Sequence, residues 1–317
     1  MKIKYLILLL LTSYCFLPTC ALATGQAGVD LSFLGAGVGA RPLGMGGAFV
    51  AVADNADSPF WNPAGIIKKS EITTMTTKLS SDSDHYYMSY VLPVFKGTVG
   101  ISWIQVGTGN ISQTSKEVDN YNEVYNLGVF SSFSNAYMLS YAREINDNLS
   151  LGVTGKYLTT DMTNILKGQG YGYSVTPGIL IKFSPKTITQ GPNGHPNPSP
   201  SLSIGCKIDE LINQQSWGTG TVEKVPPKLR LGFAYKMLNP GLFALDISQI
   251  LRNGYAAEVA AGYEWSRQGL SVRVGYSEGI TAGAGFETGH TKVDYAYTSQ
   301  PSLSKENVHR ISLTGKW

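Results

Sequence analysis

Residues 228–237 read KLRLGFAYKM and alternate strictly between two kinds of side chain. One face of the extended chain carries Leu, Leu, Phe, Tyr and Met, and the other carries Lys, Arg, Gly, Ala and Lys. A period of two residues is that of a β-strand with one apolar face, whereas a helix repeats every 3.6 residues. Similar alternation in residues 148–160, 270–277 and 292–298 indicates an all-β protein.

We predict about fourteen strands from this alternation. They cover residues 71–80, 85–94, 97–107, 134–145, 148–162, 169–184, 200–211, 226–237, 241–251, 256–268, 270–279, 281–289, 291–299 and 307–317. An even number lets both ends of a closed wall lie on one side of a membrane. Short connections alternate with longer ones, which is typical of short periplasmic turns and long external loops.

Two connections fit this alternation less well. The turn at 279–281 is short although its position in the order makes it external. Residues 190–200, QGPNGHPNPSP, form a proline-rich loop that should be periplasmic although it is long. Two interpretations are open: an unusual periplasmic loop, or a strand count that is wrong by one hairpin.

The composition favours a membrane barrel. Charged residues make up 15% of the chain, against about 25% in soluble proteins, and the chain has 36 Gly and 18 Tyr. After residue 23 no apolar run reaches the ~18 residues of a membrane-spanning helix. Only helices and closed barrels satisfy the backbone in lipid. We therefore predict a membrane-spanning antiparallel β-barrel in the bacterial outer membrane.

The first 23 residues have the features of a signal peptide. Lys2 and Lys4 precede an apolar run at 6–11, and residues 21–23, ALA, form a cleavage site. Processing as a lipoprotein at Cys20 is the alternative, although Pro18 and Thr19 fit a lipoprotein box poorly.

Residues 35–66, GAGVGARPLGMGGAFVAVADNADSPFWNPAGI, form a glycine-rich segment between the signal peptide and the strands. Such a segment suggests a plug inside the barrel, because glycines let a backbone pack closely against a wall. We expect a signal peptide at 1–23, a plug (or hatch) at 24–69 and the barrel at 70–317. A short helix is expected at 47–53, ended by Asp54 and Asn55. Phe60 and Trp61 are candidate ligand or gating residues, since the bend at Pro63 can hold or release an aromatic pair.

The chain ends in ISLTGKW at 311–317, an alternating strand with a terminal aromatic residue. We predict that Trp317 is part of the barrel insertion signal. Outer-membrane lipids and the barrel-assembly machinery are the partners that this prediction implies.

Several functions are disfavoured by the residues present. Cys206 is the one cysteine after the signal peptide, and the histidines fall in unrelated segments, so no metal site is expected. We find no catalytic motif and expect no enzyme activity and no cofactor. The chain has no basic run with interleaved aromatics that would indicate a nucleic-acid partner.

We expect charged residues on the polar strand faces to form a lumen network that anchors the plug: Lys156, Arg230, Glu258, Glu264, Arg273, Asp294 and Arg310.

Residues 39–54, GARPLGMGGAFVAVAD, followed by WNPAG at 61–65, resemble the N-terminal signature of the PorV/PorQ family of outer-membrane barrels. The segments SYAR at 140–143, RVGY at 273–276 and DYAY at 294–297 resemble strands of that family, which is related to FadL-type transporters. The resemblance implies fourteen strands and an Asn-Pro-Ala hatch motif, here Asn62, Pro63 and Ala64. It also implies one of two functions: passive transport of small hydrophobic compounds, or a PorV-like accessory role in type IX secretion that binds exported protein cargo.

Overall fold

The computed structural model describes residues 32–66, 70–114, 125–183, 200–237, 240–299 and 307–317. The predicted signal peptide and most of the loop at 190–200 lie outside these ranges. Within them, no helix is long and apolar enough to cross a membrane.

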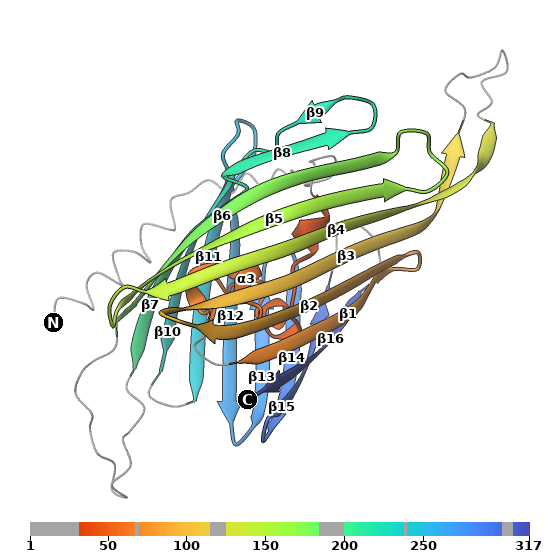
Figure 1. Ribbon diagram of the computed structural model, residues 1–317. Coiled ribbons are helices and arrows are strands. Elements are labelled where there is room, and N and C mark those ends of the chain that lie inside the picture. Colours follow the sequence, from red (N-terminus) through yellow and green to blue (C-terminus); the bar gives the residue numbers. More distant parts are fainter. Residues whose placement is uncertain (1–31, 67–69, 115–124, 184–199, 238–239, 300–306) are drawn as a thin grey trace, which may run out of the picture.

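The protein is a closed antiparallel β-barrel of fourteen strands (Figure 1). The wall strands are β1 (Glu71–Ser80), β2 (Ser83–Val94), β3 (Gly97–Thr114), β4 (Asn126–Glu144), β5 (Leu149–Met162), β6 (Gln169–Phe183), β7 (Ser201–Asp209), β10 (Lys228–Lys236), β11 (Gly241–Ile250), β12 (Glu258–Arg267), β13 (Leu270–Tyr276), β14 (Ile280–Thr288), β15 (Thr291–Thr298) and β16 (Val308–Lys316). Pairing of β1 with β16 and of β5 with β6 closes the ring. The predicted count is confirmed, so the count is not wrong by a hairpin.

Two predicted boundaries differ from the structure. The predicted loop at 211–226 contains a hairpin, β8 (Ile212–Trp217) and β9 (Val222–Glu223), which extends the edge of β6 outside the barrel ring. Strands β3 and β4 also continue past the predicted ends, to Thr114 and from Asn126, as a two-stranded ribbon. The wall is therefore taller on the β3–β6 side (Figure 1).

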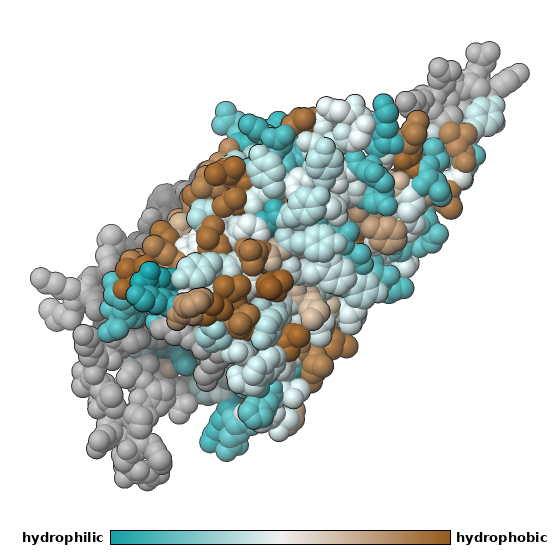
Figure 2. Space-filling model, in the orientation of Figure 1, coloured by the Kyte–Doolittle hydropathy of each residue, from teal (hydrophilic) through white to brown (hydrophobic). Residues whose placement is uncertain are grey.

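The outer face of the wall is apolar, as alternation predicts. Aligned residues of β2–β6 form one row across neighbouring strands, namely Met88, Trp103, Tyr137, Tyr157 and Tyr173. Figure 2 shows apolar side chains gathered across the middle of this face. Such a surface is stable in lipid, and the protein is an outer-membrane barrel.

The N-terminal segment, residues 32–66, lies inside the barrel and is called the plug below (Figure 1). It contains η2 (Ser32–Ala36), α2 (Ala40–Gly44), α3 (Ser58–Trp61) and η3 (Pro63–Gly65). The helix expected at 47–53 is wrong, because this stretch forms turns. Its backbone bonds to other groups instead: Phe49 and Val50 donate N–H groups to Asp246 of the wall, and Val50 accepts from Asn62.

Candidate functional site: the plug and its seat in the wall

Inward-facing glycines of the wall form the seat of the plug. A Cβ atom on any of them would come within 3.0 Å of plug atoms. We call this set the glycine collar: Gly100, Gly152, Gly178, Gly205, Gly232, Gly262 and Gly275. Several are direct cross-strand partners, such as Gly152 with Gly178 and Gly205 with Gly232. Because these positions have no side chain, plug backbone and wall backbone are in contact.

Polar side chains of the wall hold the plug backbone at the collar. Asp246 of β11 accepts the N–H groups of Phe49 and Val50 at 2.8 and 2.9 Å. On β7, Lys207 donates its Nζ to the carbonyl of Phe60 at 2.7 Å. Such bonds satisfy backbone groups that have no helix or sheet partner, since the plug contains little regular structure.

Further hydrogen bonds reach the plug from other sides of the barrel. Glu71 of β1 accepts the N–H of Ala56 at 2.8 Å, and the Tyr87 hydroxyl of β2 donates to the Ala56 carbonyl at 3.1 Å. Thr154 of β5 donates to the Pro59 carbonyl at 2.9 Å. The plug is therefore attached around its circumference and not on one side.

The Asn-Pro-Ala segment lies at the centre of this seat. The fully buried Asn62 donates from Nδ2 to the carbonyls of Val50, 2.9 Å away, and Ile179 of β6, 3.1 Å away. Its Oδ1 accepts the N–H of Ala64, so Asn62 caps the start of η3. Pro63 is the first residue of that short helix, as expected of a proline that sets a bend.

Phe60 and Trp61 are brought together beside Asn62. Their rings form an edge-to-face pair with centroids 5.3 Å apart, and Trp61 donates its indole N–H to the carbonyl of Val38. Both rings are buried in one apolar cluster with wall residues. The wall members on β1–β5 are Met75, Tyr87, Ile104, Ala136, Met138 and Leu158. Trp317 lies apart from this group, on the outer face at the end of β16.

Six of the seven residues of the predicted lumen network form ion pairs, and part of the network anchors the plug: Lys156, Arg230, Glu258, Glu264, Arg273 and Asp294. The prediction is wrong for Arg310, which among the described residues bonds Thr298 and no carboxylate.

Arg41 of α2 forms a two-point ion pair with Glu264 of β12, with N–O distances of 2.8 and 2.9 Å. Arg273 donates a hydrogen bond from Nε to Glu264 and forms an ion pair with Asp294. Asp54 pairs with Arg41 and so does not serve as the expected helix end. Arg41, Asp54, Glu264 and Asp294 border a polar cavity of about 210 Å³ between the plug and the wall strands β12–β16 and β1.

A second part of the network lies beside β6, and Lys207 joins it to the plug. Lys156 pairs with Glu210, and Lys207 and Arg230 both pair with Asp209 at 2.8 Å. Glu210 has a left-handed backbone (φ 56°) and follows inward-facing Asp209, so two consecutive carboxylates are buried. The ladder of β6 is interrupted here: it pairs with β7 from Gly178 onward and with β8 up to Val175.

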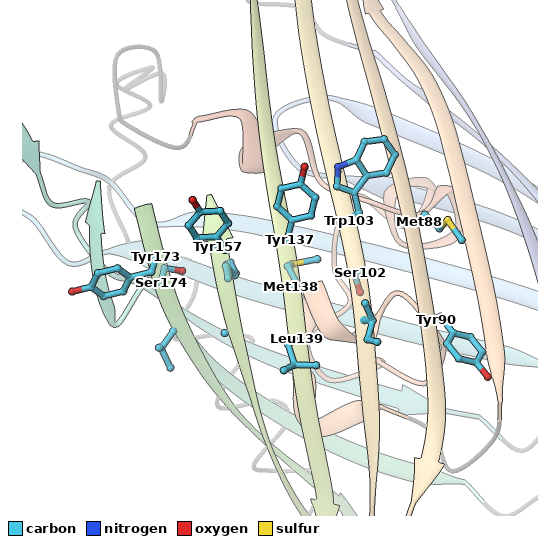
Figure 3. A pocket seen from close by; sticks show the side chains of 14 residues that line it. Met88, Tyr90, Ser102, Trp103, Tyr137, Met138, Leu139, Tyr157, Tyr173 and Ser174 are labelled. Carbon is cyan, nitrogen blue, oxygen red and sulfur yellow. The ribbon is translucent and has the colours of Figure 1, made fainter. Parts of the chain in front are cut away.

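The outer face of strands β2–β6 carries an apolar groove of about 740 Å³ (Figure 3). The aromatic rings of Trp103, Tyr137, Tyr157 and Tyr173 border it from neighbouring strands. Gly155 also lines the groove, between Leu139 and Val175 on the neighbouring strands, and leaves a gap in the row of outward side chains. The groove lies opposite the apolar lumen wall, because Ile104, Ala136 and Leu158 alternate with these aromatic residues.

One titratable group of the plug is strongly perturbed. Burial raises the pKa of the Asp57 carboxyl from 3.8 to about 7, although a hydrogen bond from Asn55 opposes the shift. Its Oδ1 has no hydrogen-bond partner among the described residues, and the carboxyl lies against Gly39, whose φ is 79°. Within the part of the chain that the structure describes, no cluster of His, Cys, Asp or Glu could hold a metal ion.

Comparison with solved structures shows the fold. The toluene transporter TbuX of Ralstonia pickettii is 13% identical with a TM-score of 0.56, over 89% of this chain and 98% of that one. The toluene transporter TodX of Pseudomonas putida is 12% identical with a TM-score of 0.58, over 89% and 99%. The monoaromatic hydrocarbon channel CymD is 11% identical with a TM-score of 0.57, over 91% and 99%. No protein-family model and no curated protein matches the sequence.

Proposed function

We propose that the protein is a passive channel for small hydrophobic molecules, with residues 24–69 as a hatch and Asn62, Pro63 and Ala64 as its central motif. The observation that carries this proposal is the apolar sector of the lumen wall on β1–β5, which the Phe60–Trp61 pair covers. A ligand that displaces this pair gains an apolar surface inside a membrane barrel. The solved hydrocarbon channels of the same fold support the proposal.

The pathway that we propose leaves the lumen sideways and not through the plug. The plug is attached on all sides, so a passage past it would break many buried hydrogen bonds at about 1–3 kcal/mol each. An opening at the interrupted ladder of β6 breaks fewer hydrogen bonds, because Thr176 and Pro177 have no ladder partner on the β7 or β8 side. Pro177 also has no N–H to donate. This position is beside Val175, at the edge of the outer groove.

A disulfide across the interruption tests this pathway. The last pair of the β6–β7 ladder is Gly178 with Lys207. Pro177→Cys and Ile208→Cys, made together with Cys206→Ser, place two outward cysteines where the next pair would stand if that ladder continued. We expect the oxidised protein to lose most uptake of radiolabelled toluene into outer-membrane vesicles, and a reductant to restore it. The control pair is Val272→Cys with Ala284→Cys, which bridges an intact ladder.

Each outcome of this experiment has one meaning. Equal uptake by the oxidised and reduced forms would place the exit elsewhere. Absence of uptake by the protein without the bridge, in vesicles that contain the folded barrel, would refute hydrocarbon transport.

The alternative is a PorV-like role in type IX secretion, in which external parts bind exported protein cargo. The ribbon of β3 and β4 favours it. Charged residues and prolines usually protect exposed strand edges from pairing with another chain. Residues 109–114 and 126–131 contain neither. Deletion of residues 110–130 should abolish cargo binding but leave toluene uptake unchanged if this role is correct.

A further inference from the structure

Two rows of outward side chains line the apolar groove on the outer face of β2–β6 (Figure 3). One row is aliphatic, the other is aromatic, and neither carries a charge. The aliphatic row consists of Ile101, Leu139, Gly155 and Val175, and the aromatic row of Trp103, Tyr137, Tyr157 and Tyr173. The groove, about 740 Å³, is within the range of about 300–1,000 Å³ of sites that bury most of a small hydrophobic ligand.

Packing within the chain does not explain Gly155, the one glycine of the aliphatic row. The glycines of the collar face the plug, which fills the space that their side chains would take. Gly155 faces outward, and a Cβ atom there would have no described neighbour closer than the carbonyl oxygen of Leu139, 4.0 Å away. A glycine inside a strand weakens the strand and often marks a place where a ligand approaches the backbone. We therefore expect the gap at Gly155 to be filled from outside the chain.

The groove ends at a polar border. The next outward row, towards the β3–β4 ribbon, consists of Gln105, Asn135 and Thr159. Gln105 Nε2 and the indole N–H of Trp103 both donate to Asn135 Oδ1, at 3.0 and 3.3 Å. On the opposite side of the groove the outward residues stay apolar or aromatic, namely Val99, Tyr141, Val153 and Pro177. The groove therefore lies at one edge of the lipid-facing zone, where outer-membrane barrels carry an aromatic girdle.

The position of the groove selects its occupant. The border lies on the side of the ribbon, and the long connections of outer-membrane barrels are external. The protein is an outer-membrane barrel, so the groove faces the acyl chains of the outer leaflet. A second barrel would present a convex wall, whereas one acyl chain can lie along the aliphatic row and against the backbone of Gly155.

The border selects the kind of lipid. Asn135 Nδ2 and Gln105 Oε1 have no hydrogen-bond partner within the residues that the structure describes, so the border offers one donor and one acceptor. Beyond the border, the charged outward residues of β2–β6 are Asp84 and Asp161. These two acids repel a phosphate group. A neutral amide linkage matches the border, because it both donates and accepts.

We propose that this groove binds one acyl chain of an outer-leaflet glycolipid in which an amide bond joins the chain to an amino sugar. The chain lies over Gly155 beside the aromatic rings, and Gln105 and Asn135 bond its amide linkage. The inference concerns the outer face of the wall and does not depend on what passes through the lumen.

The test compares two lipids that carry the same acyl chain. The purified full-length barrel, freed of lipid in detergent, is titrated with N-palmitoylglucosamine or with dipalmitoyl phosphatidylglycerol, and native mass spectrometry counts the bound molecules. We expect one N-palmitoylglucosamine per barrel, bound at least about fivefold more tightly than the phospholipid, as one hydrogen bond provides. Gly155→Leu should weaken this binding about tenfold or more, because it displaces the equivalent of two methylene groups.

Controls separate the groove from the rest of the outer wall. Ala284→Leu adds the same side chain to the outer face of β14 and should leave the affinity within about twofold. Gln105→Leu with Asn135→Leu should reduce the affinity for N-palmitoylglucosamine to that for the phospholipid. Heat-modifiable migration reports folding of each variant, and the double variant tests the inference if Gly155→Leu does not fold.

Three results would overturn the inference. Equal affinities of Gly155→Leu and Ala284→Leu would place the lipid elsewhere on the wall. Equal binding of the two lipids by the wild type would show that the border selects nothing. A dimer of barrels that Gly155→Leu abolishes would assign the groove to a second copy. Each result leaves the proposed transport function untouched, since none of them measures uptake.

Discussion

The side chain of Asn62 in the plug occupies the space beside Gly178 of β6 where another residue would have its own side chain. A Cβ atom on Gly178 would overlap the Oδ1 atom of Asn62. The amide of Asn62 meanwhile donates to the carbonyl of Ile179, the next residue of the same strand. The wall glycine and the plug amide are therefore complementary. The close packing of the plug against the wall depends on this contact and on its equivalents around the collar.

We predict from the glycine collar which glycines are needed for the plug to fill the lumen. Gly178→Ala should displace Asn62 and Pro63, and Gly205→Ala should displace Val50, because each new methyl group meets plug atoms that are already packed. We expect both variants to show higher ion conductance in planar bilayers than the wild type.

The matched control is Gly155→Ala on β5. Gly155 faces outward, and a Cβ atom at this position would lie 4.0 Å from its nearest neighbour, the carbonyl oxygen of Leu139. It should conduct like the wild type. Wild-type conductance in the collar variants would show that the plug can shift without opening the lumen.

Asn62→Ala tests whether plug and wall unfold separately. The change leaves the carbonyls of Val50 and Ile179 and the N–H of Ala64 without their side-chain partner. At about 1–3 kcal/mol for each buried unsatisfied group, the plug should become markedly less stable. Hydrogen exchange of residues 32–66 should rise, while strand amides stay protected because their ladder bonds do not involve Asn62.

Two results would contradict this prediction. Joint loss of protection in plug and wall would make them one cooperative unit and exclude independent gating. Unchanged exchange in both would mean that Asn62 contributes little to holding the plug.

The raised pKa of the Asp57 carboxyl predicts that the plug is less stable at higher pH. Its folded-state pKa, about 7, is higher than its ordinary value of 3.8. Folding of the plug therefore favours the protonated carboxyl. This contribution is complete below about pH 4, is lost as the pH rises through about 7, and amounts to at most about 4 kcal/mol.

Exchange of residues 32–66 at about pH 5 and about pH 8, corrected for intrinsic rates, measures this effect. Protection should be lower at the higher pH in the wild type. Asp57→Asn, which cannot ionise, should remove most of the difference and protect the plug at the higher pH. A pH difference that persists in Asp57→Asn would assign it to another group, such as the nearby Glu71.

The wall is predictable from sequence because each strand separates lipid from lumen, which forces alternation over its whole length. The ribbon at 109–114 and 126–131 projects beyond that boundary and lacks alternation, so the pattern does not reveal it. Glu210 escapes prediction for a related reason, since its left-handed backbone breaks the period of two.

The residues that hold the plug also escape prediction, although a signal for them exists. Asp246 and Lys207 each face a collar glycine on the neighbouring strand, Gly232 and Gly178 respectively. A long polar side chain beside a glycine can reach over it to a backbone lying in the gap. Pairing of strands must be known before that signal can be read, because the two residues are far apart in sequence.

Trp317 provides a test of barrel insertion that does not involve the plug. It continues the outward row of Ile311 and Leu313 on β16, and its ring stacks on Tyr90 of β2 with centroids 5.8 Å apart. Its backbone N–H also donates to the carbonyl of Ser70, across the seam where the first and last strands meet.

Both contacts tie the seam together at the lipid-facing rim, so we expect Trp317→Asp to insert poorly. A charge on the lipid face costs about 2–4 kcal/mol at mid-membrane and less near the interface, and the stacking on Tyr90 is lost in addition. Outer-membrane fractionation followed by heat-modifiable migration should show less folded barrel. Phe95→Asp is the control, because Phe95 is fully exposed in the turn after β2 and its positive φ suits Asp better than Phe. Equal amounts of folded Trp317→Asp and Phe95→Asp barrel in the membrane would show that closure of the seam does not depend on the terminal residue.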